Sequence, residues 1–501
     1  MQSNNSHISS SISSSDGGAF DGYREAIAYL ENRVNYENFR QIPYQELESR
    51  LVRIRAILDY LGKPDNNYSV IHVAGTKGKG STCIIFEQVL VKSGYKVGRF
   101  CSPHLHSLME RFTIDGIPCS HERFAEILLY IRDKIESWSD PDGKLSLDSF
   151  PLTYFELTTI FAMVYFAMEK VDFAVLEVGL GGRLDSTNVC KPDITIITSI
   201  SFDHLEQLGP TLDVIAKEKA GIIKSGIPII SGVRTDLARE AIRENAAKNN
   251  APLYELEVDF DIRKNQDSVL YGFSTISSKF AQKSDIAVLP RPALGEHQIR
   301  NAALVLAGVE LLREKGRIIS DESIREGFRS VKLPARIEVL RKKPTIIVDG
   351  AHNRASVKEL VQTIDANFPN RKRFLIFGTM LGKDAEGMLL ELIPSFDWTV
   401  FTQPPLLERC FPARGLIMIA QSLIADDSET FNTMVDSSFA GKDFDENFNI
   451  KSSFGEVIGE SNEAYTRVLD LAGENDLICA TGSFYLAARI RELVLGNDFQ
   501  S

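Results

Sequence analysis

The sequence predicts an α/β protein with an N-terminal P-loop-type ATPase domain built on a parallel sheet and a smaller, Rossmann-like C-terminal α/β domain. An apolar strand runs into a glycine-rich turn at residues 70–82. Strand, loop and helix patterns then alternate as far as residue 230, which is typical of a parallel sheet. A second series of this kind begins after residues 331–337. Because 501 residues exceed the size of a single growing core, we expect two domains.

The first domain is expected over residues 23–331 and the second over residues 332–501. Residues 1–22 are predicted to be a disordered leader, because they are rich in Ser and Asn and lack the apolar core of a secretory signal. Residues 426–453 are acidic and polar with few aliphatic side chains. We therefore predict a flexible insertion there.

Composition restricts the class of function. The 56 basic and 68 acidic residues give a net charge of −12, which argues against a dedicated nucleic-acid binder. No apolar run approaches the length needed to span a bilayer. The six cysteines are scattered without Cys-x-x-Cys spacing, which indicates a reducing compartment. We expect a soluble intracellular protein that binds small anionic ligands at local positive sites.

The stretch from Val70 to Thr82 is predicted to hold nucleotide phosphates. Its glycines allow the backbone amides to turn toward phosphate oxygens, its central lysine supplies a mobile positive charge, and its hydroxyls open the next helix. These residues are Gly75, Gly78, Lys79, Gly80, Ser81 and Thr82. The common phosphate-loop pattern places Lys directly before Ser or Thr, whereas here Gly80 intervenes. The alternative is an ordinary glycine-rich turn between a strand and a helix.

Three further polar residues lie at the end of a predicted buried strand, just after such a strand, or on the helix that follows. Glu177 lies near the end of the strand at residues 171–179, where a carboxylate invites a metal ion. His204 follows the strand at residues 193–200, and the helix after it carries Lys219. Ligands of parallel α/β units gather at the carboxyl ends of strands, so these residues are candidates for one site.

Seven motifs occur in one unbroken order over roughly residues 24 to 495. They are Gly75-Thr-Lys-Gly-Lys-Gly-Ser81, Ser102-Pro-His104, the run from Glu177 to Asn188, Asp203-His204, the run from Glu218 to Lys224, His297-Gln-Ile-Arg-Asn301 and Asp349-Gly-Ala-His-Asn353. Together they resemble the folate branch of the Mur ligase superfamily, with the nearest likeness to bacterial-type and plant dihydrofolate synthases. That branch holds the dihydrofolate synthases and the folylpolyglutamate synthases.

The resemblance implies coupling of ATP cleavage to amide formation between a pterin-linked carboxylate and L-glutamate, with two Mg²⁺ ions. It implies that Ser102 and Glu177 hold one ion at the ATP phosphates and that His204 helps to hold the second. Oxygen ligands suit Mg²⁺, while His is less usual for it. Lys219 matches a position at which the family carries a carbamylated lysine; the alternative is a solvated helix lysine.

The resemblance also assigns residues before, within and after the stretch at residues 331–337. Asn301, Arg336 and Asp349 match residues that contact ATP, with Arg336 near the phosphates and Asp349 toward the ribose. The alternatives are a linker salt bridge for Arg336 and a strand-end cap for Asp349. His352 is predicted to contact substrate or phosphate.

The loop after Glu177 bears on the choice of acceptor. Asp185 matches a residue that helps bind dihydropteroate in bacterial bifunctional members, and a carboxylate can accept two parallel hydrogen bonds from a pterin. Ser186 stands where those members carry Ala. We expect both residues to contact the substrate.

The first choice of function is dihydrofolate synthase. The alternative is folylpolyglutamate synthase, either as the single activity or together with dihydrofolate synthase activity in a bifunctional enzyme. The cell-wall Mur ligases and a degenerate ATP-binding regulatory protein fit the motifs less well. Expected ligands are ATP, L-glutamate and dihydropteroate or a folate, and the expected state is a monomer. Resemblance to the plant enzymes implies the mitochondrial matrix, with the cytosol as the alternative.

Overall fold

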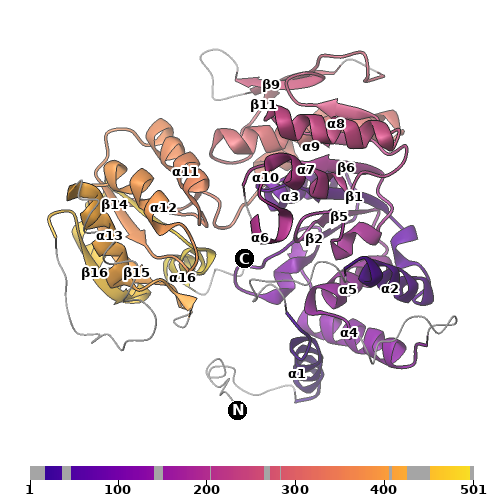
Figure 1. Ribbon diagram of the computed structural model, residues 1–501, viewed down its shortest axis with the longest axis horizontal. Coiled ribbons are helices and arrows are strands. Elements are labelled where there is room, and N and C mark those ends of the chain that lie inside the picture. The colour runs from indigo at the N-terminus through magenta and orange to yellow at the C-terminus, as the bar shows by residue number, and fades with distance from the viewer. Residues whose placement is uncertain are drawn as a thin grey trace. The chain divides into compact units, whose positions relative to one another are not determined.

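The computed structural model describes residues 17–35, 47–139, 151–202, 205–264, 271–281, 284–405, 409–425 and 452–496 (Figure 1). The chain divides into two compact units. The first comprises residues 1–261, 274–284 and 304–327, and the second comprises residues 262–273, 285–303 and 328–501. The second unit thus includes residues 262–273 and 285–303, which the sequence analysis placed in the first domain.

An eight-stranded sheet with the order β4-β3-β2-β5-β1-β6-β7-β8 forms the centre of the first unit. The six neighbouring strands β2, β5, β1, β6, β7 and β8 are parallel to one another. Strand β3 is antiparallel to β2, and β4 is antiparallel to β3 at the edge of the sheet. Their bounds are β1 Ser69–Ala74, β2 Val97–Phe100, β3 Phe112–Ile114, β4 Ile117–Pro118, β5 Phe173–Glu177, β6 Ile194–Ile197, β7 Ile229–Ser231 and β8 Leu253–Glu255.

The helices of the first unit follow the predicted alternation. The helix after the phosphate loop begins at Lys79, two residues earlier than expected, because Gly78 with φ +83° takes the N-cap position. The α-helices and 3₁₀ turns (η) are α1 Gly17–Glu31, α2 Leu47–Tyr60, η3 Pro64–Asn66, α3 Lys79–Lys92, η4 Leu108–Arg111, α4 His121–Glu136, α5 Tyr154–Met168, η5 Ser186–Val189, α6 Leu205–Leu208, α7 Leu212–Ala220 and α8 Asp236–Lys248.

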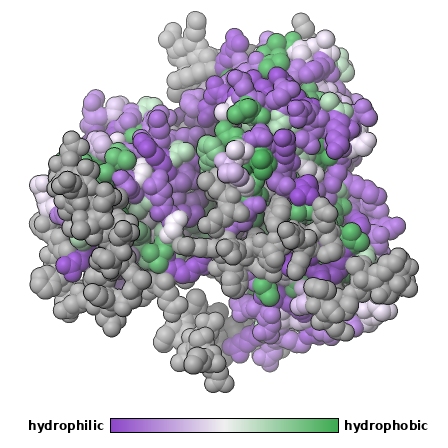
Figure 2. Space-filling model, in the orientation of Figure 1, coloured by the Kyte–Doolittle hydropathy of each residue, from purple (hydrophilic) through white to green (hydrophobic). Residues whose placement is uncertain are grey.

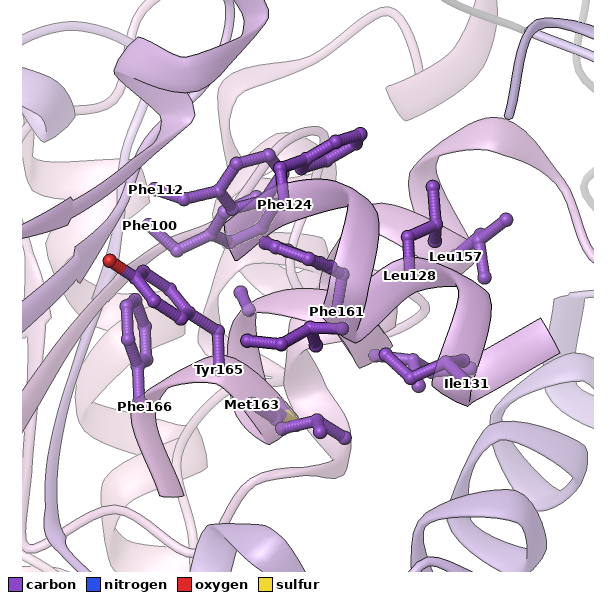
Figure 3. Packing of buried hydrophobic residues seen from close by; sticks show 14 of the residues in the cluster. Phe100, Phe112, Phe124, Leu128, Ile131, Leu157, Phe161, Met163, Tyr165 and Phe166 are labelled. Carbon is purple, nitrogen blue, oxygen red and sulfur yellow. The ribbon is translucent and has the colours of Figure 1, made fainter. Parts of the chain in front are cut away.

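Aromatic side chains dominate the core between α4, α5 and strands β2 and β3 (Figure 3). The Phe161 ring on α5 lies 4.6 Å from that of Phe112 and 4.7 Å from that of Phe124, measured between ring centroids. A second cluster packs α7 and α8 against the ends of β1 and β6. Burial of these apolar groups stabilises the sheet whose strand ends carry the predicted site.

Helix α1 corrects one prediction. It begins at Gly17, so residues 17–22 are helical and do not belong to a disordered leader; residues 1–16 lie outside the described part of the chain. The reason is tertiary packing. Tyr23 stacks on His121 with 4.2 Å between ring centroids, and Ala26 and Leu30 are buried in the same core.

Three short strands, β9 Phe260–Lys264, β10 Tyr271–Thr275 and β11 Asp285–Leu289, form a separate sheet in the order β11-β10-β9. Two helices follow in the chain, α9 Glu296–Glu314 and α10 Asp321–Ser330. Glycines allow close packing of both helices on α3 within the first unit: a Cβ at Gly308 would meet the Phe86 ring at 2.7 Å, and one at Gly327 would meet the Val89 Cα at 2.7 Å.

The second unit contains a six-stranded sheet with the order β12-β13-β17-β14-β15-β16. Strand β12 is antiparallel to β13, and the other pairs are parallel. The strands are β12 Glu338–Lys342, β13 Thr345–Val348, β14 Arg373–Phe377, β15 Trp398–Gln403, β16 Gly455–Glu460 and β17 Leu477–Thr481. The helices are α11 Arg354–Asn367, α12 Ala385–Leu392, η6 Ile393–Ser395, α13 Ala413–Ala425, α15 Ser461–Leu471 and α16 Phe484–Leu495.

These observations confirm the predicted α/β class. Residues 426–451 of the predicted insertion lie outside the described residues. The six cysteines, all within the described residues, are buried and form no disulfide. No helix in the described ranges is long and apolar enough to cross a membrane. On the face shown in Figure 2, hydrophilic residues cover most of the coloured surface, and hydrophobic ones are scattered among them.

Candidate active site

The predicted residues of the first unit gather where four parallel strands end. Strands β2, β5, β1 and β6 are neighbours in the sheet, and their carboxyl ends lead into Cys101, Val178, Gly75 and Thr198. This is the edge at which open parallel sheets bind ligands. The described residues that the sequence predicts for this site therefore lie at one edge of the sheet.

The phosphate loop is held in a conformation that needs glycine. Gly75 has φ +147°, and a Cβ there would come within 1.9 Å of the Thr198 Oγ1. The same Thr198 hydroxyl donates to the Lys77 carbonyl oxygen at 2.6 Å. The Thr76 backbone N–H donates to the Ser199 carbonyl at 2.7 Å. The end of β6 thus fixes the loop before any ligand binds, so the loop is preorganised for an anion.

Lys79, Gly80 and Ser81 form the first turn of α3, directly after Gly78. Unpaired backbone N–H groups and the helix dipole favour an anion at such a terminus. The Lys79 ammonium is partly buried and has no hydrogen-bond or ion-pair partner among the described residues. Ser81 is 4% exposed. This arrangement fits a phosphate cradle better than an ordinary turn.

Glu177 at the end of β5 lies against Gly80 and Ser102. Its Oε2 accepts a hydrogen bond from the Ser102 backbone N–H at 3.1 Å, and it is the nearest atom to a Cβ built on Gly80, at 3.3 Å. Glu177 is 5% exposed, and no described Lys, Arg or His pairs with it. A buried carboxylate without a counter-ion fits a bound cation.

The donor set here also fits Mg²⁺. Among the described residues, no group of three or more His, Cys, Asp or Glu side chains could hold a metal ion. Mg²⁺ is commonly held by one or two protein oxygens together with waters and substrate phosphates. The Glu177 carboxylate and the Ser102 hydroxyl, next to a phosphate cradle, match that pattern.

Gly80→Ala is expected to impair the use of Mg²⁺-ATP without harming the fold. Its Cβ would crowd the Glu177 carboxylate, while Ala favours a helix over Gly by about 1 kcal/mol. We expect about a ten-fold loss of turnover and a higher Mg²⁺ requirement, because small misplacements at such sites are costly. Mg²⁺ titration of ATP turnover, with thermal unfolding as the control for folding, checks this. An unchanged Mg²⁺ requirement would contradict the role of Gly80.

Lys219 on α7 is 5% exposed, and its Nζ donates to the Gly75 carbonyl oxygen at 3.1 Å. The structure therefore brings Lys219 to the first glycine of the phosphate loop, 144 positions earlier in the chain. It is not a solvated helix lysine. His204, the other predicted residue in this region, lies outside the described residues.

The loop after β5 is hydrogen-bonded to the end of α7. The Arg183 backbone N–H donates to the Glu218 carbonyl at 2.8 Å, and the Arg183 Nε donates to the Glu218 Oε1 at 3.1 Å. A Cβ at Gly182 would meet the Lys219 carbonyl oxygen at 2.8 Å. The Asn188 amide donates to the carbonyls of Arg183 at 2.9 Å and Gly221 at 3.1 Å. The backbone around Lys219 is thus fixed by this loop.

Asp185 holds that loop together from inside. Its carboxylate accepts hydrogen bonds from the backbone N–H groups of Leu180 and Thr187, both at 3.0 Å, and from the Thr187 hydroxyl. Because the Thr187 hydroxyl donates to Asp185, the His72 Nε2, 2.8 Å away, is the donor to Thr187. Burial raises the pKa of Asp185, and the bonds from Thr187 oppose this rise.

His72 extends this chain of hydrogen bonds to β1. It is fully buried, and burial, together with the charge of Lys224, lowers its pKa to about 3, so the ring is neutral. The prediction that Asp185 and Ser186 contact the pterin remains a prediction. Ser186, in η5, is 9% exposed. A direct bond from a pterin to the Asp185 carboxylate would compete with the donors that already hold the loop.

The turn after Ser102 is supported by residues that the sequence analysis did not single out. The Glu110 carboxylate accepts hydrogen bonds from the backbone N–H groups of Leu105, His106 and Ser107 at 2.8–2.9 Å. Arg111 Nε donates to His104 Nδ1 at 2.9 Å. The Ser-x-x-Glu spacing at 107–110 is a capping-box signal that could have revealed this support.

In the second unit, Asp349 follows β13 and uses both carboxylate oxygens. Its Oδ2 accepts from the Ile337 backbone N–H and its Oδ1 from the Ala351 backbone N–H, both at 2.8 Å. The Arg336 guanidinium carbon lies 4.2 Å from the centroid of the Phe484 ring. His352 Nδ1 donates to the Gly350 carbonyl at 2.9 Å.

Asn301 lies separately on α9, where its amide donates to the Gln298 Oε1 at 3.0 Å. The structure thus groups Arg336, Asp349 and His352 in the second unit, as the motif order suggested. Asn301 instead bonds to a residue of its own helix. Phe484, at the start of α16, joins this cluster and was missed because a lone apolar residue after a strand carries no chemical signal.

The titration of Asp349 gives a prediction for stability. Burial raises its pKa to about 6 from 3.8, opposed by Arg336 and the two backbone donors, while Glu359 raises it further. A raised folded-state pKa adds stability below pH 3.8, which is lost as pH rises through about 6. Relative to the Asp349→Asn variant, the free energy of unfolding of the wild-type protein should rise by up to about 3 kcal/mol as the pH falls from 7 to 4.

Chemical unfolding of both proteins at several pH values checks this. Trp398 lies on β15, so its fluorescence in a Trp138→Phe background reports on the second unit. If the free energies of unfolding of wild type and Asp349→Asn change with pH in the same way, the pKa of Asp349 is not raised by folding and the prediction is wrong.

Comparison with known proteins extends this picture. Residues 142–309 match the model of the Mur ligase middle domain, and residues 335–484 match that of the Mur ligase, glutamate ligase domain. The chain is 35% identical over 377 residues to the dihydrofolate synthase/folylpolyglutamate synthase of Bacillus subtilis, covering 74% of this chain and 83% of that protein.

Two solved structures resemble the fold along most of its length. Mycobacterium tuberculosis folylpolyglutamate synthase complexed with ADP and AMPPCP has a TM-score of 0.77 at 28% identity, covering 96% of this chain and 99% of that chain. Escherichia coli FolC in complex with DHPP and ADP has a TM-score of 0.74 at 28% identity, covering 94% and 97%. These matches confirm the two-domain α/β fold and an ATP-binding function. The chain belongs to the folate branch of the Mur ligase family, whose members are ATP-dependent amino acid ligases.

Proposed function

We propose that the chain is a dihydrofolate synthase, which joins L-glutamate to 7,8-dihydropteroate through an acyl phosphate. A carboxylate is a poor acyl donor, so ATP first transfers its γ-phosphoryl group to the pteroate carboxylate. The glutamate nitrogen then attacks the acyl carbon, and inorganic phosphate leaves. The products are dihydrofolate, ADP and phosphate, and the enzyme acts as a monomer.

The observation that carries the proposal is the meeting of five groups at one edge of the first sheet. They are an unpartnered lysine, a close-packed glycine, a buried carboxylate, a serine and a second, buried lysine: Lys79, Gly80, Glu177, Ser102 and Lys219. Phosphoryl transfer depends on positive charge and positioning. Ser102 and Glu177 would hold one Mg²⁺, which neutralises charge on the transferring group.

Two further roles come from the resemblance to the family. His204 is proposed to help hold a second Mg²⁺, and Lys219 to act as a carbamate beside it. The buried position of Lys219 next to Gly75 supports this, because a carbamate would place an anion near the predicted ions. In the second unit, Asn301, Arg336, Asp349 and His352 are proposed to contact ATP or substrate.

The choice of dihydropteroate rests on the loop at residues 179–188. Its sequence follows the pattern of the bacterial-type and plant dihydrofolate synthases, and its internal hydrogen bonds through Asp185 keep it in one conformation. A relative with this fold, Escherichia coli FolC, has been solved with DHPP and ADP. We propose that this loop recognises the pterin.

Purified full-length protein with ATP, Mg²⁺ and L-glutamate tests the proposal, given dihydropteroate or a reduced folate monoglutamate as the acceptor. We expect a higher kcat/KM with dihydropteroate. A preference for the folate would assign the chain as a folylpolyglutamate synthase, and comparable values would indicate a bifunctional enzyme. Consumption of neither acceptor would refute the folate ligase assignment for this chain.

A further inference from the structure

The residues on either side of Arg336 have an unusual backbone conformation. Ala335 has φ +52° and Ile337 has φ +51°, which is the left-handed region that residues with a Cβ seldom adopt. For a β-branched residue such as Ile it is a pronounced outlier. Such conformations persist only where the surrounding structure holds them, and they gather at functional sites.

Three hydrogen bonds hold this turn. The Ala335 backbone N–H donates to the Glu338 Oε2 at 2.9 Å, and the Ile337 backbone N–H donates to the Asp349 Oδ2 at 2.8 Å. The Ala335 carbonyl accepts from the Gly350 backbone N–H at 2.9 Å. The backbone before and after Arg336 is thus fixed from both sides.

Helix α16 contacts the same turn at two points. Arg491 Nε donates to both oxygens of Glu338, at 3.1 Å each, and so supports the carboxylate that binds Ala335. Phe484 places its ring 4.2 Å from the Arg336 guanidinium carbon. Since Phe484 and Arg491 are seven residues apart, they lie two turns apart on one helix face. One face of α16 therefore holds both the backbone and the side chain of Arg336.

The Phe484 ring is itself fixed. A Cβ at Gly350 would meet it at 2.8 Å, and the His352 ring lies 5.8 Å away between centroids. Ser483 caps the start of α16 by accepting from the Leu486 backbone N–H at 3.1 Å. The ring is packed between Gly350, His352 and Arg336, so its contacts hold the guanidinium in place.

We infer that Phe484 is a positioning residue that fixes the Arg336 guanidinium for its proposed contact with ATP. Asp349 acts with it by fixing the strained turn through the Ile337 N–H. The inference rests on the proposed function, because it takes Arg336 to contact the nucleotide. A guanidinium over an aromatic ring keeps its N–H groups at its edge, and one of those of Arg336, on Nη1, donates to the Ala335 carbonyl at 3.2 Å.

A double-mutant cycle on the full-length chain tests this, with the dissociation constant for AMPPCP and Mg²⁺ measured by calorimetry. Phe484→Leu keeps an apolar side chain and removes the ring, and we expect about five-fold weaker binding. Phe484→Tyr keeps the ring and should bind as wild type. Tyr485→Ala is the matched control, since Tyr485 is the next residue on α16 and is 44% exposed. We expect no change in binding for this control.

In the Arg336→Ala background, Phe484→Leu should cause no further loss, because the two residues act as a unit. An equal loss in both backgrounds would overturn the inference, as would unchanged binding in Phe484→Leu or in Arg336→Ala alone. Thermal unfolding of each variant separates misfolding from lost positioning. The cycle needs no acceptor, so a wild type that binds AMPPCP but ligates neither acceptor would refute only the proposed function.

Discussion

Replacing Lys79 with Ala is expected to lower the formation of acyl phosphate by at least about a thousand-fold, because it removes the lysine that we propose neutralises charge on the transferring γ-phosphoryl group. The Lys79 ammonium has no partner among the described residues, so the fold does not depend on an interaction that the variant removes. Rapid-quench measurement of ADP formation with the preferred acceptor checks the effect on chemistry.

Lys92→Ala is the matched control for this variant. Lys92 is an exposed lysine in the last turn of the same helix, and its replacement should leave ADP formation and the melting temperature unchanged. If Lys79→Ala forms ADP at the wild-type rate, residues 75–82 do not act as a phosphate cradle.

Replacing Lys219 with Ala is expected to lower turnover about a hundred- to a thousand-fold, since it removes a buried group at the first glycine of the phosphate loop. If Lys219 acts as a carbamate, a short carboxylate such as formate or acetate should fit the space left by the side chain and restore part of the activity. Steady-state turnover with and without these anions is the measurement.

The control for Lys219 lies on the same helix. Lys217→Ala removes an exposed lysine that pairs with Asp213 at 3.4 Å, a contact of little energetic value, and should leave turnover unchanged. Loss of activity in Lys219→Ala without rescue would indicate a structural role, through the hydrogen bond to Gly75. Full activity would exclude Lys219 from the site.

Much of the fold could be predicted because local patterns decide it. Helix α5, for example, starts at a capping box formed by Thr153 and Glu156, whose spacing is a local signal in the sequence. Strand β1 follows directly from an apolar run before Gly75. By contrast, α1 packs through a few residues that are separated from its partners by about a hundred positions, and such tertiary contacts leave no local signal.

The candidate site shows the same limit. The glycine-rich loop pattern pointed to Lys79 and the end of a buried strand pointed to Glu177, whereas Lys219 was predicted only from the family motif around it. The contacts that position them were not visible: Gly80 against Glu177 and Lys219 against Gly75 join segments about a hundred positions apart or more. Spacing along the chain carries no information on such distances, so only the folded structure gives these roles.

The most direct test of the account follows one oxygen atom from the acceptor. Dihydropteroate labelled with ¹⁸O in its carboxylate is ligated to glutamate by the purified full-length protein, and the released phosphate is examined by mass spectrometry. Activation as an acyl phosphate predicts that one ¹⁸O atom passes to each phosphate for every dihydrofolate formed. Phosphate without label, in a reaction that still forms the amide, would contradict activation of the carboxylate by ATP.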